Sequence, residues 1–104
     1  MGMFDMLGKL GEVKKAMDTI KARLDTITVE GEAGEGNVKV IMTGNRLVKT
    51  IAISDRMMSI DRKNELEELL ELAINRANEK AQNVSDSEMK SAGKGILPDI
   101  PGLF

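Results

Sequence analysis

The sequence predicts an α+β domain: a long N-terminal helix, a three-stranded antiparallel β-meander and a long C-terminal helix. Apolar residues recur at helical spacing toward both ends of the chain, whereas the middle third alternates apolar and polar residues. Two glycine-containing turns interrupt that alternation, which is the pattern of consecutive hairpins. The 104 residues fit a single domain. We expect it to span residues 1–92, with an apolar C-terminal tail at 93–104.

The first helix is predicted from apolar residues spaced alternately by four and three, a coiled-coil-like seam. These residues are Met6, Leu10, Val13, Met17, Ile20, Leu24 and Ile27. Basic residues flank the seam, so pairing with a second copy of itself would oppose like charges. The acidic first half of the second helix is the better partner, and we expect Lys21 to face Glu68.

Three strands are predicted at residues 27–32, 37–43 and 46–54, joined by turns at 33–36 and at Gly44-Asn45. Closing these turns places Val40 opposite both Val29 and Lys49, and pairs Glu30 with Lys39. Both turns put the same residues on one apolar face: Val29, Val38, Val40, Met42, Leu47, Ile51 and Ile53. Lys49 shares this face, where we expect it to snorkel past the core edge or to pair with an acid across a dimer interface.

The second helix is predicted to begin near Asp61. Its apolar stripe consists of Leu66, Leu69, Leu70, Ala73, Ile74, Ala77, Ala81 and Val84. Gly93 to Gly95 should break this helix, and the two prolines of the tail prevent any regular element after it. The tail is unexpectedly apolar, and is therefore either a docking strip or a disordered end.

Composition excludes most catalytic and metal chemistry. The chain has no Cys and no His, so it lacks disulfides, the usual soft metal ligands, a histidine base and a thiol nucleophile. The glycines at 31–36 lead into a strand and not a helix, so they form a hairpin turn and not a phosphate loop. We expect no catalytic residue, no cofactor, no metal and no small-molecule substrate. Without a membrane span or signal peptide, a cytoplasmic protein is expected.

The strongest candidate for a binding surface is a local cluster of bases on the first helix, since the net charge is −2. The cluster consists of Lys9, Lys14, Lys15, Lys21 and Arg23. It is either a solvated helix face or a site of phosphate contact. Phe4 and Phe104 are the only aromatic residues, so the chain has no stacking platform for single strands. Any nucleic-acid partner is therefore duplex DNA, held through its backbone with weak sequence preference.

The order of segments resembles the YbaB/EbfC family over essentially the full chain. The resemblance lies in the amphipathic Met3 to Leu24 segment, the run Val29-Glu30-Gly31-Glu32-Ala33-Gly34 followed by Val38-Lys39-Val40, the Gly44-Asn45 turn, the helical Ala73 to Ala77, and the Pro-Gly-Leu-Phe ending. It implies a bacterial nucleoid-associated protein that forms an intertwined homodimer with projecting helices that contact DNA. In this chain the helix cations are the cluster above, with Arg76, Lys80 and Lys90 as secondary candidates.

The main alternative is a dimeric adaptor or chaperone-like scaffold that holds another protein. The net acidity and the apolar tail favour it. DNA binding would weaken steeply with salt, whereas an adaptor would lose its client when residues 96–104 are removed.

Overall fold

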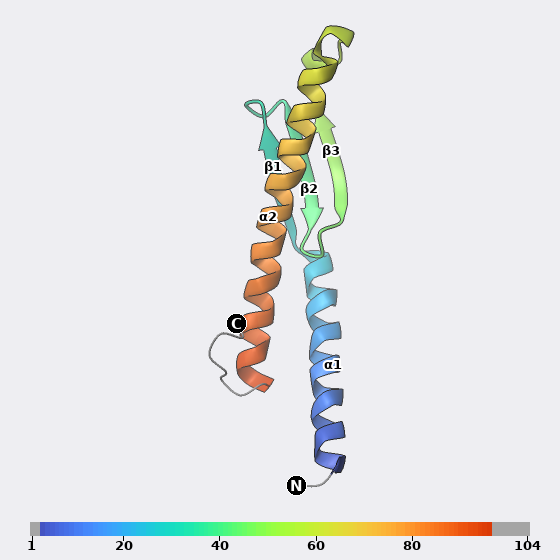
Figure 1. Cartoon of the computed structure of the whole chain (residues 1–104), viewed down its shortest axis with the longest axis vertical. Coiled ribbons are helices and arrows are strands. Elements are labelled where there is room, and N and C mark those ends of the chain that lie inside the picture. Colours follow the sequence, from blue (N-terminus) through green and yellow to red (C-terminus); the bar gives the residue numbers. More distant parts are fainter. Residues whose placement is uncertain (1–2, 97–104) are drawn as a thin grey trace.

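The structure is a computed structural model that describes the backbone of residues 3–96 and the side chains of residues 10–92. The elements follow in the order α1 (Met3–Thr26), β1 (Thr28–Ala33), β2 (Val38–Thr43), β3 (Val48–Ile53), two 3₁₀ turns (Asp55–Met57 and Ile60–Arg62) and α2 (Lys63–Ile96). This order confirms the predicted helix–meander–helix class. The molecule is a rod of 68 × 24 × 16 Å. The sheet lies toward one end, and α1 extends from it beside the C-terminal half of α2 (Figure 1).

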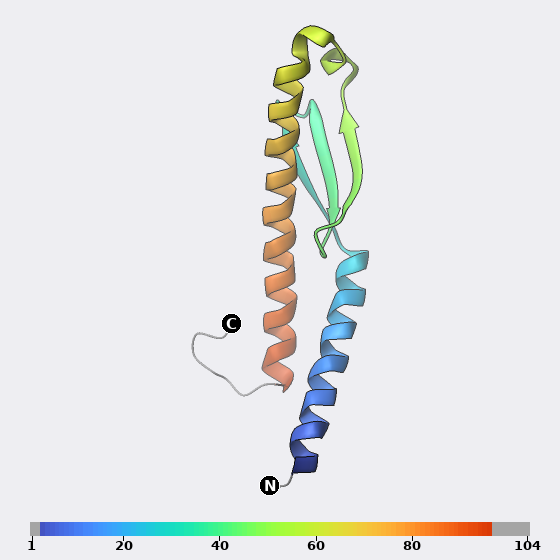
Figure 2. The same ribbon diagram turned by 45° about the vertical axis from the view of Figure 1, so that its right-hand side comes forward.

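The core forms where α2 lies across β1 and β2. The sheet is antiparallel with the strand order β1-β2-β3, and α2 covers one of its faces (Figure 2). The buried residues of this core are Ala33, Val38, Val40, Met42, Ala73, Ala77 and Ala81, with Val29, Leu66, Leu69, Leu70 and Ile74 partly buried around them. The alanines of the predicted α2 stripe are therefore its most deeply buried part.

Small residues bring α2 and β1 into backbone contact at Gly31. A Cβ atom built on Gly31 would lie 2.9 Å from the Cα of Ala77, and closer still to the backbone oxygen of Ala73 and the backbone nitrogen of Ala77. These atoms belong to main chain, so they cannot rotate out of the way. A glycine is therefore required at this crossing.

The first hairpin has the expected faces but a different register. Gly31 pairs with Val40, and Lys39 pairs with Glu32 and not Glu30. Gly34, Glu35 and Gly36 all have positive φ, a conformation that two glycines make accessible. The four-residue loop therefore starts at Gly34, one residue later than predicted, and Ala33 belongs to the strand. Because the register shifts by two residues, each side chain keeps its predicted face.

The second hairpin is also two residues out of the predicted register over most of its length. Val40 pairs with Ile51, and the pairing shifts between Ile41 and Met42. The loop includes Arg46 (φ 65°), so it is longer than a two-residue turn. Lys49 has no partner where the register shifts, and its side chain is exposed. Placing Lys49 opposite Val40 was wrong.

The β2–β3 turn holds the C-terminal end of α1. The backbone N–H of Gly44 donates to the Leu24 carbonyl at 3.0 Å. The side-chain amide of Asn45 donates to the Lys21 carbonyl at 3.0 Å and also to the Asp25 carboxylate. The last carbonyls of a helix lack partners within the helix. The turn supplies a donor to one of them, the Leu24 carbonyl, and adds the Asn45 bonds about one helical turn earlier. These bonds fix the base of α1 against the sheet.

Two expectations about the long helices were wrong. The α2 helix continues through Gly93 and Gly95 to Ile96, because a glycine in a helix costs only about 1 kcal/mol relative to alanine. Within the chain, α1 runs beside the C-terminal half of α2, where Arg23 pairs with Glu88. The acidic first half of α2 packs over the sheet, so Lys21 does not face Glu68. The predicted tail from residue 97 onward lies outside the described residues.

Two α2 cations cover the carbonyls of β1, which is an edge strand. The Arg76 guanidinium donates to the Glu32 carbonyl at 2.8 Å, and the Lys80 ammonium donates to the Glu30 carbonyl at 2.7 Å. Unpaired groups at a sheet edge are templates for association with other strands, and long cationic side chains are a common protection. Arg76 and Lys80 therefore protect this edge.

We predict that Gly31→Ala destabilises the fold by about 3 kcal/mol, the upper range for overpacking a tight core. The measurement is denaturant unfolding followed by circular dichroism. Gly11→Ala is the matched control, because a Cβ at Gly11 meets nothing within 4 Å. The control should raise stability by about 0.5–1 kcal/mol through helix propensity. Equal effects of the two substitutions would contradict the proposed backbone contact.

We predict that the double variant Arg76→Met and Lys80→Met aggregates at lower protein concentration than the unmodified chain. The substitutions keep apolar stems but leave the β1 carbonyls uncovered. Light scattering against concentration measures the effect. The control is Lys63→Met with Lys90→Met, which removes the same charge from exposed α2 positions. Similar scattering of both variants would assign the effect to net charge.

Candidate nucleic-acid interface

The predicted cations of α1 project from an arm that lies beyond the sheet. Lys14, Lys15 and Lys21 are exposed on this helix. Arg23 differs from them, because its guanidinium lies 3.2 Å from the carboxylate of Glu88 on α2. The backbone of Lys9 lies in α1, but its side chain is outside the described residues. Three lysines of the cluster are thus exposed, while Arg23 links the two helices.

The geometry of α1 suits contact with a repeating row of charges. Lys14 and Lys21 are seven residues apart, so they lie on the same helix face about 10 Å apart along the axis. Exposed lysines can contact phosphates without reading the base sequence. Glu12, Asp18 and Asp25 are exposed on the same helix, which limits the positive potential of the arm.

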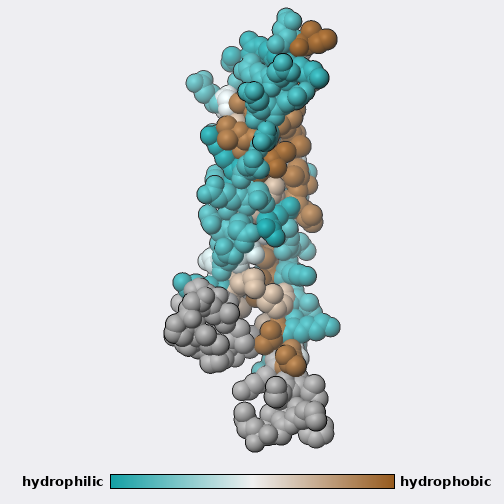
Figure 3. All heavy atoms as spheres, in the orientation of Figure 1, coloured by the Kyte–Doolittle hydropathy of each residue, from teal (hydrophilic) through white to brown (hydrophobic). Residues whose placement is uncertain are grey.

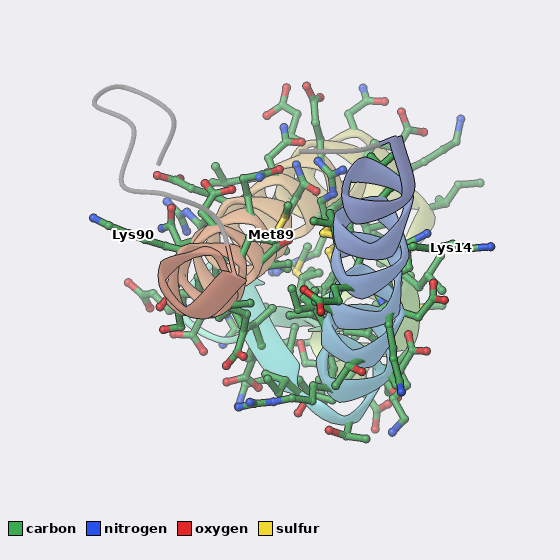
Figure 4. All side chains as sticks on the ribbon, turned by 90° about the horizontal axis from the view of Figure 1, so that it is seen from below. Lys14, Met89 and Lys90 are labelled. Atoms are coloured by element: carbon green, nitrogen blue, oxygen red, sulfur yellow. The ribbon has the colours of Figure 1, made fainter. Side chains whose placement is uncertain are left out.

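The secondary candidates on α2 do not join this surface within one chain. Lys14 and Lys90 point away from each other on opposite sides of the helix pair, and Met89 lies between the helices (Figure 4). Arg76 and Lys80 lie farther along α2, where they bond to β1. The predicted set is therefore split into three places: the α1 arm, the outer face of Lys90, and the edge of the sheet.

The structure also identifies positioning residues that sequence reasoning missed. Gly44 and Asn45 were predicted as a turn, but their hydrogen bonds to α1 depend on a fold that brings the turn to the helix end. Arg46 adds a second connection by donating to the side-chain oxygen of Gln82 on α2 at 2.6 Å. Together these residues tie the β2–β3 turn to both helices and so set where the α1 arm starts.

Among residues 10–92 no group of three or more acidic side chains is placed to hold a metal ion. No helix within residues 3–96 is both long and apolar enough to cross a membrane. What the arrangement can do is present exposed lysines on a helical arm that is fixed at one end.

Comparison with known proteins assigns this architecture to a family. Residues 1–96 match the model of the YbaB/EbfC DNA-binding family. A nucleoid-associated protein of Flavobacterium johnsoniae is 34% identical over 103 residues, which is 99% of this chain and 95% of that protein. One from Anaeromyxobacter dehalogenans is 38% identical over 92 residues, covering 88% and 87% of the two chains.

A solved structure agrees on the fold. The crystal structure of an uncharacterized protein from Helicobacter pylori superposes with a TM-score of 0.73 at 18% identity, covering 94% of this chain and 99% of that one. The helix–meander–helix order and the match of residues 1–96 to the family model lead to one assignment. The chain belongs to the YbaB/EbfC DNA-binding family.

Proposed function

We propose that this protein is a nucleoid-associated protein that binds duplex DNA as a homodimer, mainly through backbone phosphates and with weak sequence preference. The observation that carries the proposal is the set of exposed lysines, Lys14, Lys15 and Lys21, on the α1 arm of a chain from a DNA-binding family. The relatives named above are nucleoid-associated proteins. The same location, the nucleoid in the bacterial cytoplasm, and a role in nucleoid organisation or gene expression follow for this chain.

Phosphate contact is favoured over base readout by the residues of the arm. The described part of α1, residues 10–26, carries lysines and an arginine but no Asn, Gln or aromatic side chain. Bidentate contacts to adenine come from Asn or Gln, and Arg23, the one guanidinium there, is bound to Glu88. Lysine contacts position a protein on the duplex without fixing a sequence. Because the net charge is −2, the attraction is local to the arm.

The β3 strand supports the homodimer. It is the second edge of the sheet, and α2 leaves apolar side chains there uncovered: Leu47, just before the strand, is 63% exposed, and Val48 and Ile51 are 47% and 46% exposed. Hydrophobic residues gather on this side of the molecule in Figure 3. An exposed apolar edge strand is a site of association. A second copy is the partner that would cover it.

The elongated shape of the chain explains why a dimer would bind DNA more tightly than a single chain. The radius of gyration is 19.2 Å, against about 13 Å for a compact domain of this length. A single chain presents one α1 arm with few exposed lysines. A dimer presents two arms, and simultaneous contact of both with one duplex raises the overall affinity without any new type of contact.

The protein acts in this proposal by binding alone, without catalysis. A dimeric adaptor or chaperone-like scaffold is the second candidate. Exposed apolar side chains at the end of the rod opposite the α1 arm favour it: Met58 is 68% exposed and Ile60 89% exposed. Isolated apolar side chains are ordinary on protein surfaces, so the DNA proposal is the stronger one.

We predict that the triple variant Lys14→Gln, Lys15→Gln and Lys21→Gln binds duplex DNA at least about tenfold more weakly, a loss of about 1.4 kcal/mol. Each lost phosphate contact should reduce the salt slope of the affinity by about 1. Fluorescence anisotropy of labelled duplexes, from low to physiological salt, measures both quantities.

The matched control removes the same charge elsewhere through Lys39→Gln, Arg56→Gln and Lys63→Gln, all at exposed positions away from the arm. This control should bind almost as well as the unmodified chain. If both variants lose affinity equally, the contact is not on α1. If the folded, unmodified protein binds no DNA even at low salt, the DNA proposal fails and the adaptor becomes the function to test.

We predict that the double variant Val48→Glu and Ile51→Glu is a folded monomer, because carboxylates cannot be buried unpaired in an apolar interface. Sedimentation equilibrium gives the mass and circular dichroism the helix content. Ile60→Glu is the control, since this exposed side chain lies away from β3, and it should leave the dimer intact. A dimer that survives both β3 substitutions would show that the interface lies elsewhere.

A further inference from the structure

A groove with an apolar floor separates α1 from the C-terminal part of α2. Ala16 and Ile20 of α1 and Ala92 of α2 line its floor, while two acids and two bases surround it, and these are Glu12, Lys15, Arg23 and Glu88. The open volume is about 550 Å³, the size of a cleft that holds a drug-sized ligand. No described segment of the chain fills this groove. A cleft with this floor suits a short apolar peptide.

We propose that residues 97–104 of the same chain occupy this groove. The position of α2 supports the proposal, because Ala92 lines the groove and Ile96, one helical turn later, is the last described residue. The segment after Ile96 therefore starts at the open end of the groove. Eight extended residues reach about 26 Å, whereas the groove follows α1 from Glu12 to Arg23, about 17 Å along the helix. The segment is long enough to turn back and cover it.

The composition of residues 97–104 matches the groove. Four of the eight side chains are large and apolar, and the list is Leu97, Ile100, Leu103 and Phe104. Pro98 and Pro101 have no backbone N–H, so an extended segment carrying them leaves fewer donors to satisfy against an apolar floor. Asp99 is the only charged residue of the segment, so the segment brings a single charge to the groove.

Occupation of the groove braces the α1 arm. In the described structure α1 is held near its C-terminal end by Gly44 and Asn45, by the buried side chains of Ile20 and Leu24, and by the Arg23–Glu88 pair. That pair is partly exposed, and exposed ion pairs contribute little. A docked segment contacts both helices at once and adds apolar burial between them. This inference concerns the position of the arm and does not depend on DNA binding.

Cysteine cross-linking in the full chain tests the proposal, because the chain has no native Cys. The test pair is Thr19→Cys, which lines the groove, with Ile100→Cys. The control pair is Lys14→Cys with Ile100→Cys, since Lys14 points away from α2 (Figure 4). Both pairs share Ile100→Cys and are separated by similar lengths of chain, so a much faster reaction at Thr19 reports docking. We expect disulfide formation at least about tenfold faster in the test pair, which corresponds to about 1.4 kcal/mol in favour of docking.

Mixing isotopically labelled and unlabelled chains identifies which chain supplies the segment. Mass spectrometry should find the Thr19–Ile100 cross-link within one chain. Equal rates for the two pairs would overturn the proposal. A cross-link found only between chains would also overturn it, and would assign the groove to a second copy.

A second measurement needs no cysteine. Hydrogen exchange of the chain ending at Ile96 should be faster than that of the full chain at α1 residues 12–23, with β2 unchanged as an internal reference. Unchanged exchange in α1 would contradict docking. Binding of duplex DNA is not part of either measurement, so failure of this inference and failure of the DNA proposal are distinguishable.

Discussion

The contact between the backbones of β1 and α2 at Gly31 determines the arrangement of the other elements. Since Gly31 has no side chain and Ala73 and Ala77 have small ones, the helix lies directly on the strand. At this distance α2 covers β1 and β2 but does not extend over β3. The same contact places Arg76 and Lys80 at the carbonyls of β1. One edge of the sheet is thereby protected, while the other keeps its apolar residues exposed.

The arms follow from the same geometry. Because α2 is longer than the sheet that it covers, its C-terminal half extends past the sheet and runs beside α1 (Figure 1). The Gly44-Asn45 turn holds α1 at the point where it leaves the sheet. The body of the fold is thus rigid where α2 meets β1, whereas the arms depend on fewer contacts. The proposed DNA surface lies on the part of the molecule with the least internal packing.

The basic residues of α2 have two different roles. Their positions in the sequence do not show which residue has which role. Arg76, Lys80 and Lys90 are all bases on one helix, yet two of them bond to β1 and one faces solvent away from α1. Arg23 likewise belongs to the basic cluster of α1 but pairs with Glu88. A base on a helix is a candidate for phosphate contact only when the fold leaves its head group free.

The sequence by itself determined the element order, the faces of the strands and the stripe of α2, because hydrophobic periodicity is a local property of the chain. It did not determine the register of the first hairpin. The position of that loop depends on which residues take positive φ, and on Ala33, which packs in the core as part of the strand. The break predicted at Gly93 to Gly95 was wrong for a related reason: local propensity is a weak constraint on a long helix. Only the tertiary structure decided which cations donate hydrogen bonds to the backbone. Arg76 and Lys80 reach the carbonyls of β1 because Gly31 allows α2 to lie directly on that strand.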